Sequence, residues 1–383
     1  MADQYCAIAV LGYAESGKST LIGSFVNAVT TRAGGSPQSM EALRHKCDVF
    51  ESERVNGHSE VASYWPVMSD EGELEIIVTP GVRKFWKWID FSLADADAAV
   101  LVVRVPEDGI LSIPAFLEPL SQCIGFGVPV TAIVVNVFES VDNSHVENTV
   151  QAITADWRRM HPEMTLPLIV PVRVSDGNGM DRLTKHLFSV RAPVRTSTSA
   201  FQLPINVLFT KGDSVIVGGK IFSGHLSVGD KLFLMPARVP VSVESICISQ
   251  RRDVSSAAAG RIVGVRLGGI ARNHVTTGMV LVADPCGGSA TRLFRAEINV
   301  FNSKCPIRVG FSPMVSIQSC HVHAQIVEIG KEKSALDLGD TALVTLSLNK
   351  TVFAEAFPSP FGRLIVRHEN VTIAVGVIRE ILD

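Results

Sequence analysis

The first half of the chain alternates between short apolar runs and longer amphipathic stretches. The apolar runs are rich in Val, Ile and Leu and cover residues 7–11, 74–78, 98–104, 130–135 and 168–172. Near-continuous runs of this kind are typical of strands that are buried on both faces. The stretches between them predict helices at residues 19–29, 85–93, 113–124, 146–160 and 180–190. This alternation predicts βαβ units, with helices on both faces of a parallel sheet.

The pattern changes after residue 192, where the segment "RAPVRTSTSAFQLP" indicates a linker. Beyond it, short strand-like runs alternate with glycine-containing turns, and no long helix is predicted. Such a pattern is typical of small antiparallel barrels. A break near "DPCGGSAT" divides this half in two. We therefore predict an α/β domain at 1–192, a linker at 193–203, and two antiparallel β-barrel domains at 204–287 and 288–383.

Composition favours a packed globular protein, because 46% of the 383 residues are hydrophobic and 19% are charged. No apolar run approaches the ~20 residues that a membrane-spanning helix needs, and the N-terminus does not resemble a signal peptide. Seven scattered cysteines argue against a disulfide framework. We expect a cytoplasmic protein without a membrane partner. The net charge of −3 excludes a uniformly basic nucleic-acid binder, and we expect no DNA partner.

The segment "LGYAESGKST" matches the pattern G-x-x-x-x-G-K-[ST] through Gly12, Gly17, Lys18 and Ser19. It lies between a predicted strand and a predicted helix, as a phosphate-binding loop requires. Backbone N–H groups and the helix N-terminus would bind phosphate oxygens. Lys18 is predicted to reach the outer phosphates and Ser19 to coordinate Mg²⁺. The loop residues Glu15, Ser16 and Thr20 complete the predicted nucleotide contacts; the alternative is an ordinary glycine-containing turn.

The phosphate loop and several other segments of the chain resemble those of the translational GTPases of the elongation factor 1-alpha group. The likeness lies in "GYAESGKSTLIG", in "ADADAAVLVV" at 94–103 and in "GRLIVRHENVTIAVGVI" at 362–378. Barrel segments at 219–236, 257–270 and 294–301 resemble one branch, which contains the ribosome-rescue GTPase that partners Pelota and the class II release factor. The resemblance implies GTP and Mg²⁺ as ligands. It implies the ribosome as partner, together with a Pelota-like or release-factor-like protein or a tRNA.

Two segments called switches should sense the outer phosphate in this family. The first aligns with "ESERVNGHSEV" and places Ser59 where a Mg²⁺-binding Thr is expected; the alternative is a plain surface serine. The second should read Asp-x-x-Gly-His, but Val78 and Val82 replace the acid and the histidine. Gly81 remains and can still offer its N–H to a phosphate. Positioned proton-transfer groups contribute roughly 10²–10⁴ in rate, so hydrolysis is expected to be lost or very slow.

Guanine recognition in this family uses Asn-Lys-x-Asp at the end of a strand. Here Asn136 is kept, Val137 replaces the lysine, and Glu139 replaces the aspartate. Valine cannot supply the lysine stem that packs over the base, and glutamate carries its carboxylate one methylene further out. A last turn that touches the base aligns with Arg173 and Val174. We expect weakened base reading, although Glu139 is also consistent with a solvated loop.

The segment "VRKFWKWI" mixes basic and aromatic residues. On a helix, Phe85, Trp88 and Ile89 share one face and most simply pack on the sheet. This leaves Trp86 outside with the basic residues, as a ribosome-facing or partner-facing patch.

The segment "CHVH" at 320–323 holds possible zinc ligands, but on a strand its residues alternate between faces, so a zinc site is disfavoured. The segment "SVESICISQRRD" aligns with the region that holds the charged tRNA end in tRNA-delivering relatives. Cys247 stands where an acid is expected there, which disfavours tRNA delivery.

These observations predict a translation-factor-like GTP-binding protein that acts at the ribosome with a tRNA-shaped protein partner, in ribosome rescue, mRNA surveillance or termination. It would be a pseudo-GTPase or a very slow GTPase, for which we predict no catalytic residue. Two alternatives stay open. One is an active elongation factor that delivers aminoacyl-tRNA, and the other is an interaction scaffold that needs no nucleotide.

Overall fold

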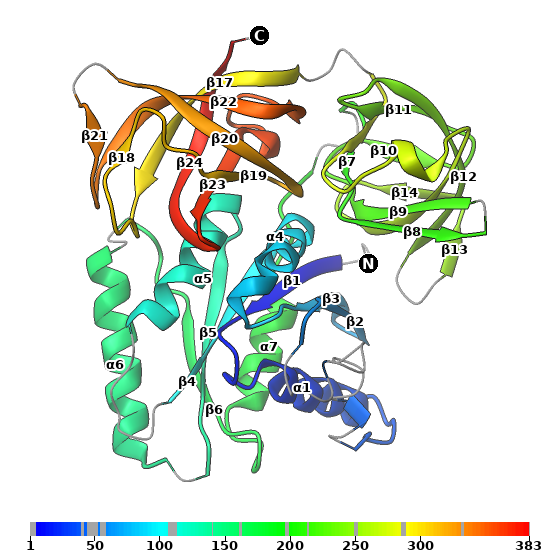
Figure 1. Ribbon diagram of the computed structural model, residues 1–383. Coiled ribbons are helices and arrows are strands. Elements are labelled where there is room, and N and C mark those ends of the chain that lie inside the picture. Colours follow the sequence, from blue (N-terminus) through cyan, green and yellow to red (C-terminus); the bar gives the residue numbers. More distant parts are fainter. Residues whose placement is uncertain are drawn as a thin grey trace. The chain divides into compact units, whose positions relative to one another are not determined.

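The computed structural model describes residues 5–39, 42–43, 53, 59–105, 113–139, 141–160, 163–195, 199–212, 214–248, 252–284, 289–330 and 333–382 (Figure 1). The chain divides into two compact units. The first contains residues 1–123 and 128–192, and the second contains residues 124–127 and 193–383. Within the described ranges, no helix is both long enough and apolar enough to cross a bilayer.

The first unit is built on a sheet with the strand order β2-β3-β1-β4-β5-β6. Its strands are β1 (Tyr5–Leu11), β2 (Ser63–Ser69), β3 (Gly72–Val78), β4 (Ala98–Arg104), β5 (Val130–Asn136) and β6 (Leu168–Val172). All neighbours pair in parallel except β2, which runs antiparallel to β3. The five apolar runs are therefore confirmed as strands, and the parallel order places the carboxyl ends of β1, β3, β4 and β5 at one edge.

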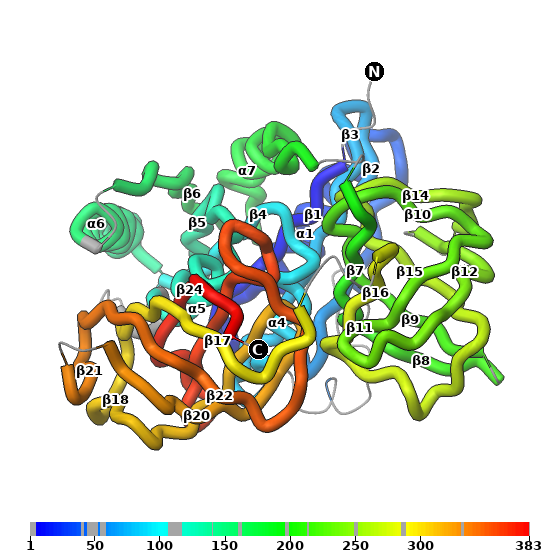
Figure 2. The backbone as a smooth tube through the Cα atoms, turned by 90° about the horizontal axis from the view of Figure 1, so that it is seen from above, coloured from blue at the N-terminus to red at the C-terminus, as the bar shows by residue number. Residues whose placement is uncertain are grey.

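Helices cover both faces of this sheet (Figure 2). They are α1 (Lys18–Arg32), α4 (Trp86–Asp95), α5 (Ile113–Phe126), α6 (Asn143–Met160) and α7 (Met180–Ser189), with a 3-10 turn, η1, at Arg83–Phe85. α1 and α7 pack on one face, where the rings of Phe25 and Phe188 have centroids 6.3 Å apart. The predicted helices are confirmed, and their ends differ by at most three residues.

Strand β2 is not among the strands predicted from the sequence, because it has no continuous apolar run. In β2 only Ser63, Trp65 and Val67 are buried, because an antiparallel edge strand packs on one face. Both edge strands of the sheet contain a proline. Pro66 lies in β2, and Pro171 lies in β6 at the opposite edge.

The first part of the second unit is a strongly curved, open sheet with the order β7-β16-β11-β12-β15-β9-β8, in which β13 also pairs with β12. Its strands are β7 (Gln202–Pro204), β8 (Val207–Lys211), β9 (Ser214–Lys220), β11 (Lys231–Met235), β12 (Val239–Ile248), β13 (Arg252–Val254), β15 (Ile262–Gly268) and β16 (Val280–Val282). The short strands β10 (His225–Ser227) and β14 (Ser256–Ala258) form a separate pair, and η3 is a 3-10 turn at Arg272–His274. This half-barrel encloses its own apolar core.

The second part is a closed barrel with the order β17-β22-β20-β19-β23-β24. Its strands are β17 (Ser289–Val300), β19 (Met314–Ile317), β20 (Cys320–Ile329), β22 (Thr341–Ala354), β23 (Arg363–His368) and β24 (Val371–Ile381). Strands β18 (Ile307–Arg308) and β21 (Ala335–Leu336) pair beside it, and η4 is a 3-10 turn at Pro360–Gly362. The predicted class, an α/β domain followed by two antiparallel barrels, is confirmed. The exact domain and linker boundaries stay predictions.

Candidate nucleotide-binding site

The loop between β1 and α1 has the backbone of a phosphate-binding loop. Glu15 (φ 64°) and Gly17 (φ 86°) adopt left-handed conformations, and α1 begins at Lys18. Turns of this kind direct successive N–H groups toward one point, where they bind anions together with the helix N-terminus. Half-buried Ser19 and Thr20 occupy the first turn of the helix.

Lys18 is held in place by the loop itself. Its Nζ donates hydrogen bonds to the backbone oxygens of Gly12 (2.8 Å) and Tyr13 (2.7 Å). The side chain is 7% exposed, and this burial lowers the pKa of Lys18 to about 7. A buried ammonium group beside a ring of N–H donors is suited to binding a polyanion.

Ser16 and Gly12 form the tightly packed base of the loop. The Ser16 Oγ is buried and has no hydrogen-bond partner within the described part of the chain. A Cβ on Gly12 would lie 2.4 Å from the Val102 backbone oxygen and 2.8 Å from that Oγ, so no larger residue fits. The orphaned hydroxyl is an available donor at the floor of the loop.

Asn136, at the end of β5, fastens that strand to the phosphate loop. Its Nδ2 donates to the Ser16 backbone oxygen at 2.9 Å. A Cβ on Gly17 would lie only 2.1 Å from the same nitrogen. The structure therefore brings Asn136 together with Ser16 and Gly17, two of the predicted loop residues.

The second switch continues from β3 and is hydrogen-bonded both to the end of β1 and to the phosphate loop. Both the backbone N–H and the hydroxyl of Thr79 donate to the Val10 backbone oxygen, at 3.1 and 3.0 Å. The Ala14 N–H donates to the Gly81 oxygen at 3.0 Å, and a Cβ on Gly81 would lie 2.4 Å from that nitrogen. Gly81 is thus in direct contact with the phosphate loop.

The two valines of the second switch have different surroundings. Val78 is 1% exposed, belongs to the apolar core, and pairs with Val10 in β1 and Ser63 in β2. Val82 is half-buried and precedes the 3-10 turn. Neither side chain can accept or donate a proton.

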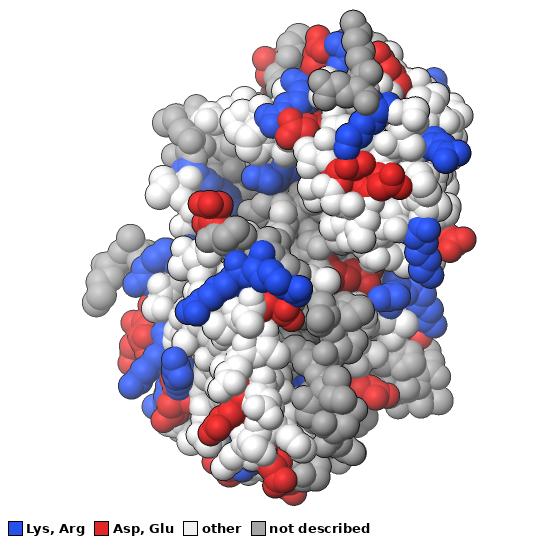
Figure 3. Space-filling model, turned by 90° about the vertical axis from the view of Figure 1, so that its left-hand side faces the viewer, with Lys and Arg blue, Asp and Glu red and all other residues white. Residues whose placement is uncertain are grey.

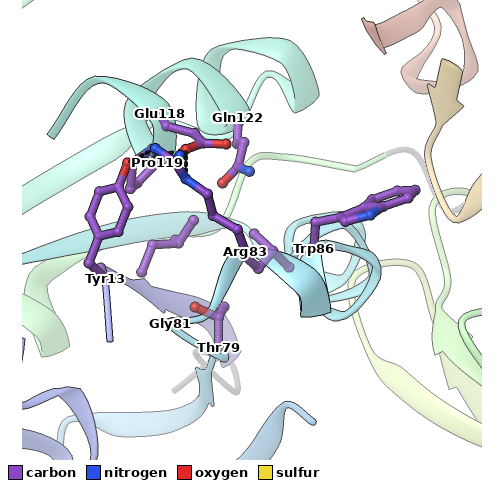
Figure 4. A pocket seen from close by; sticks show the side chains of 11 residues that line it. Tyr13, Thr79, Gly81, Arg83, Trp86, Glu118, Pro119 and Gln122 are labelled. Atoms are coloured by element: carbon purple, nitrogen blue, oxygen red, sulfur yellow. Dashed lines mark hydrogen bonds and ion pairs between the residues drawn. The ribbon is translucent and has the colours of Figure 1, made fainter. Parts of the chain in front are cut away.

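Arg83, Tyr13 and Glu118 form a polar cluster at a pocket beside the second switch, which Figure 4 shows. The Arg83 Nε lies 2.9 Å from the Glu118 Oε2, and the Tyr13 hydroxyl donates to the same oxygen at 3.1 Å. The hydrogen bond from Arg83 to the Tyr13 hydroxyl (3.2 Å) raises the pKa of Arg83. This cluster was not predicted, because nothing in the sequence indicates that Glu118 faces a loop more than a hundred residues away.

Three family models match most of the chain. The model described as "Elongation factor Tu GTP binding domain" matches residues 3–242. The chain belongs to the elongation factor Tu and 1-alpha family of translational GTPases. The model "Elongation factor Tu domain 2" matches residues 214–282, and "GTP-eEF1A C-terminal domain-like" matches residues 293–379.

Individual translational GTPases align over nearly the whole chain. Elongation factor 1-alpha of Methanosarcina mazei is 24% identical, covering 97% of this chain and 96% of that protein. The same factor from Picrophilus torridus is 24% identical and covers 96% of each. The solved structure of translation elongation factor SelB from Methanococcus maripaludis with the GTP analogue GppNHp has a TM-score of 0.77 and 18% identity. It covers 100% of this chain and 80% of that one.

The first switch of this translational GTPase lies largely outside the described residues, but its end is described. Ser59 is half-buried. The fully buried Glu53 accepts hydrogen bonds through Oε1 from the backbone N–H groups of Glu60 (2.6 Å) and Val61 (3.0 Å). The carboxylate thus fixes the backbone directly after Ser59.

The base-reading elements lie on loops at the same edge of the sheet. Val137 is buried, and its N–H donates to the Val172 oxygen at 2.9 Å, whereas Glu139 is exposed. The Arg173 N–H donates to the Asn178 oxygen at 3.0 Å, which closes the turn that contains Val174. Contacts of these residues with a nucleotide stay predictions.

The aromatic segment after the second switch differs from its prediction. Trp86 is buried at 6% exposure, whereas Phe85, Trp88 and Ile89 are only half-buried. The prediction that Trp86 lies outside was wrong: α4 begins only at Trp86, after the 3-10 turn at Arg83–Phe85, and the Trp86 side chain is buried among the residues that line the pocket. Lys84 and Lys87 are exposed as predicted, with ammonium groups 4.6 Å from the Phe85 ring and 5.7 Å from the Trp86 ring, respectively.

The segment at 320–323 is part of β20, as predicted. Cys320 and Val322 are buried, and His323 is exposed on the opposite face. Among the described residues, no group of three or more His, Cys, Asp or Glu is arranged to hold a metal ion.

Proposed function

We propose that this translational GTPase binds GTP with Mg²⁺ and hydrolyses the nucleotide very slowly or not at all. The contrast between two neighbouring segments carries the proposal. The phosphate loop keeps its buried, hydrogen-bonded Lys18, while Val78 of the second switch is part of the apolar core. In this proposal the bound nucleotide stabilises one shape of the protein, and turnover does not drive its cycle.

The described residues fit a triphosphate. The Lys18 ammonium would exchange its two carbonyl partners for phosphate oxygens, and the N–H groups from Glu15 to Thr20 would surround the inner phosphates. The orphaned Ser16 hydroxyl adds a donor. The Gly81 N–H would contact the outermost phosphate from the second switch.

A Mg²⁺ ion would be held by hydroxyl groups and by the nucleotide. Ser19 would supply one hydroxyl from α1, and Ser59 would supply the second from the first switch. Glu53 supports this role by fixing the backbone that follows Ser59. Without a carboxylate at position 78, the ion would depend more strongly on phosphate oxygens, which are ligands that Mg²⁺ prefers.

Slow hydrolysis is expected from the side chains around the position of the attacking water molecule. Val82 cannot orient a water molecule, and the next residue, Arg83, already pairs with Glu118. A group that positions the nucleophile contributes roughly 10²–10⁴ in rate.

Single-turnover hydrolysis tests this proposal. Purified protein, with and without ribosomes, should bind GTP in Mg²⁺ and release phosphate at least 100-fold more slowly than a competent elongation factor 1-alpha assayed in parallel. Lys18→Ala should abolish binding. Val82→His should raise the rate measurably, because it returns a titratable group to the switch. Hydrolysis at the rate of the parallel factor would overturn the proposal.

We further propose that the protein works in the cytoplasm at the ribosome, with a Pelota-like or release-factor-like protein of tRNA-like shape. Two observations support this finer reading. The barrels resemble that branch in sequence, and Cys247 stands where tRNA-delivering relatives are expected to have an acid. Cys247 is half-buried on β12 opposite Gly264, where a Cβ would lie 2.8 Å from its Sγ.

Surface charge is compatible with a partner that is recognised by shape. On the face shown in Figure 3, Lys and Arg are interspersed with Asp, Glu and uncharged residues. A surface of mixed charge is better suited to binding a protein than to binding a bare phosphate backbone.

Delivery of aminoacyl-tRNA is the second candidate, and one observation favours it. The relatives aligned over 97% and 96% of the chain are elongation factors 1-alpha. Binding assays with the GTP-bound protein would separate the candidates. Capture of a Pelota-like protein without affinity for aminoacyl-tRNA supports the first, and protection of aminoacyl-tRNA from deacylation supports the second.

A further inference from the structure

Phe138 is the middle residue between Val137 and Glu139, and no part of the family's base-reading pattern assigns it a role. We propose that its ring, backed by the Arg104 guanidinium group, is the stacking platform for the nucleobase and makes the site tolerant of different purines. This inference rests on the proposed function, because it requires that a nucleotide occupies the phosphate loop.

The position of Phe138 relative to the phosphate loop is fixed by contacts. Asn136, two residues earlier, is hydrogen-bonded to the Ser16 backbone. The Cζ atom of Phe138 lies 3.9 Å from the point where a Cβ on Gly17 would stand. The ring therefore lies beside the N-terminus of α1, one residue before Lys18.

The ring contacts a cation and is still partly exposed. The Arg104 guanidinium carbon, at the end of β4, lies 4.5 Å from the ring centroid. The Phe138 side chain nevertheless keeps 37% exposure, while the adjacent Val137 is 6% exposed. A cation that stacks on one side holds an aromatic ring in place and leaves its remaining surface available to a flat ligand.

The chemistry of the ligand follows from what the platform can recognise. A ring face stacks on any base, because every base has a π-face, and it reads no donor or acceptor pattern. With Val137 in place of the lysine stem, hydrogen-bond reading rests on Glu139 and the turn at 173–174. A site that reads by hydrogen bonds rejects a wrong ligand strongly, whereas an apolar surface discriminates only weakly. We therefore expect GTP, ITP and ATP to bind within about tenfold of one another.

Binding of nucleotides and of base-free tripolyphosphate by the full chain tests the platform. Phe138→Ala should lower the affinity for GTP and for ATP about tenfold, the usual effect of removing a base-stacking ring. It should leave the affinity for tripolyphosphate in Mg²⁺ unchanged. Phe138→Trp should retain nucleotide affinity. Phe209→Ala is the matched control, because that ring is 52% exposed on β8 of the other unit.

A spectroscopic readout separates stacking from loss of structure. The fluorescence of 2-aminopurine riboside triphosphate should be quenched on binding to the wild type, and less so with Phe138→Ala. Nucleotide affinity unchanged by Phe138→Ala would overturn the platform and leave the proposed function intact. Failure of the wild type to bind both nucleotide and tripolyphosphate would overturn the proposed function itself. A preference for GTP over ATP above a thousandfold would overturn the inferred purine tolerance.

Discussion

The Arg83 guanidinium group and the Glu118 carboxylate form an ion pair between the second switch and α5, with 2.9 Å between Nε and Oε2. The Glu118 side chain is only 8% exposed, whereas that of Arg83 is 50% exposed. Because Tyr13 of the phosphate loop bonds to the same carboxylate, one acid joins α5, the phosphate loop and the second switch. The second switch is therefore restrained without help from a nucleotide.

Arg83→Ala should loosen the second switch, because it leaves a largely buried carboxylate without its charged partner. The loss of a hydrogen bond to a charged group costs about 1.5–3 kcal/mol, and we expect the lower end here because Arg83 is half exposed. Amide hydrogen exchange over residues 79–86 should become faster. Arg295→Ala is the control, since its pair with Glu380 is exposed on both sides and should contribute about 0–1 kcal/mol. Equal exchange over residues 79–86 in both variants would contradict this restraint.

Nucleotide affinity should fall as the pH rises above 7. Burial lowers the pKa of Lys18 to about 7 in the free protein, and a bound triphosphate favours the charged form. Below pH 7 Lys18 is already charged, so affinity is constant there. Above pH 7 binding must take up a proton, and the Kd should rise by up to about tenfold per pH unit.

Calorimetry in Mg²⁺ between pH 6 and 9, in buffers of different ionisation enthalpy, measures both the Kd and the proton uptake. Lys18→Arg is the control, because arginine stays charged throughout this range. A Kd that is constant from pH 6 to pH 9 in the wild type would show that Lys18 is charged in the free protein.

Gly17→Ala should damage the site more than Gly177→Ala, which introduces similar backbone strain but no steric clash. Both Gly17 (φ 86°) and Gly177 (φ 75°) are left-handed, which costs an alanine about 1–2 kcal/mol. A Cβ on Gly17 would in addition lie 2.1 Å from the Asn136 Nδ2, whereas nothing lies within 4 Å of one on Gly177. Thermal unfolding should show a larger loss for Gly17→Ala, and only this variant should lose nucleotide affinity. Similar losses in both variants would mean that Asn136 moves aside easily.

Val78→Asp should destabilise the protein, because it buries a carboxylate at a core position that is 1% exposed. The loss of stability relative to the wild type should become smaller at low pH. Burial raises the pKa of a carboxyl group, and burying the neutral acid costs less free energy than burying the carboxylate. Val78→Thr, of similar volume and uncharged, is the control. Melting curves at pH 5 and pH 7.5 measure the difference. A Val78→Asp variant as stable as the wild type would mean that this position still faces a hydrated ion site.

Much of the fold was predictable because parallel strands bury both faces and leave a continuous apolar signal. The runs at 98–104 and 168–172 coincide with β4 and β6 to the residue. Strand β2 carries only the weaker alternating signal of an edge strand, interrupted by Pro66. The burial of Trp86 was not predictable, because no periodicity in the sequence indicates that a 3-10 turn delays the start of α4 to that residue.

The site was predictable where its chemistry is local in the sequence. Lys18, Gly17 and Asn136 lie in short motifs, and the structure brings them together. The Arg83–Glu118 pair and the Arg104–Phe138 stack each join residues about 35 positions apart, on different elements. Only the packing of those elements reveals them.

The prolines at the two borders of the sheet have a consequence for association. Pro66 in β2 and Pro171 in β6 have no backbone N–H, so each outer strand offers an incomplete row of donors. An edge strand with missing N–H donors pairs poorly with a strand of another chain. Such pairing is a common route to self-assembly and fibre formation. Contacts of other molecules with these two borders of the sheet would therefore depend on side chains and loops instead of on strand pairing.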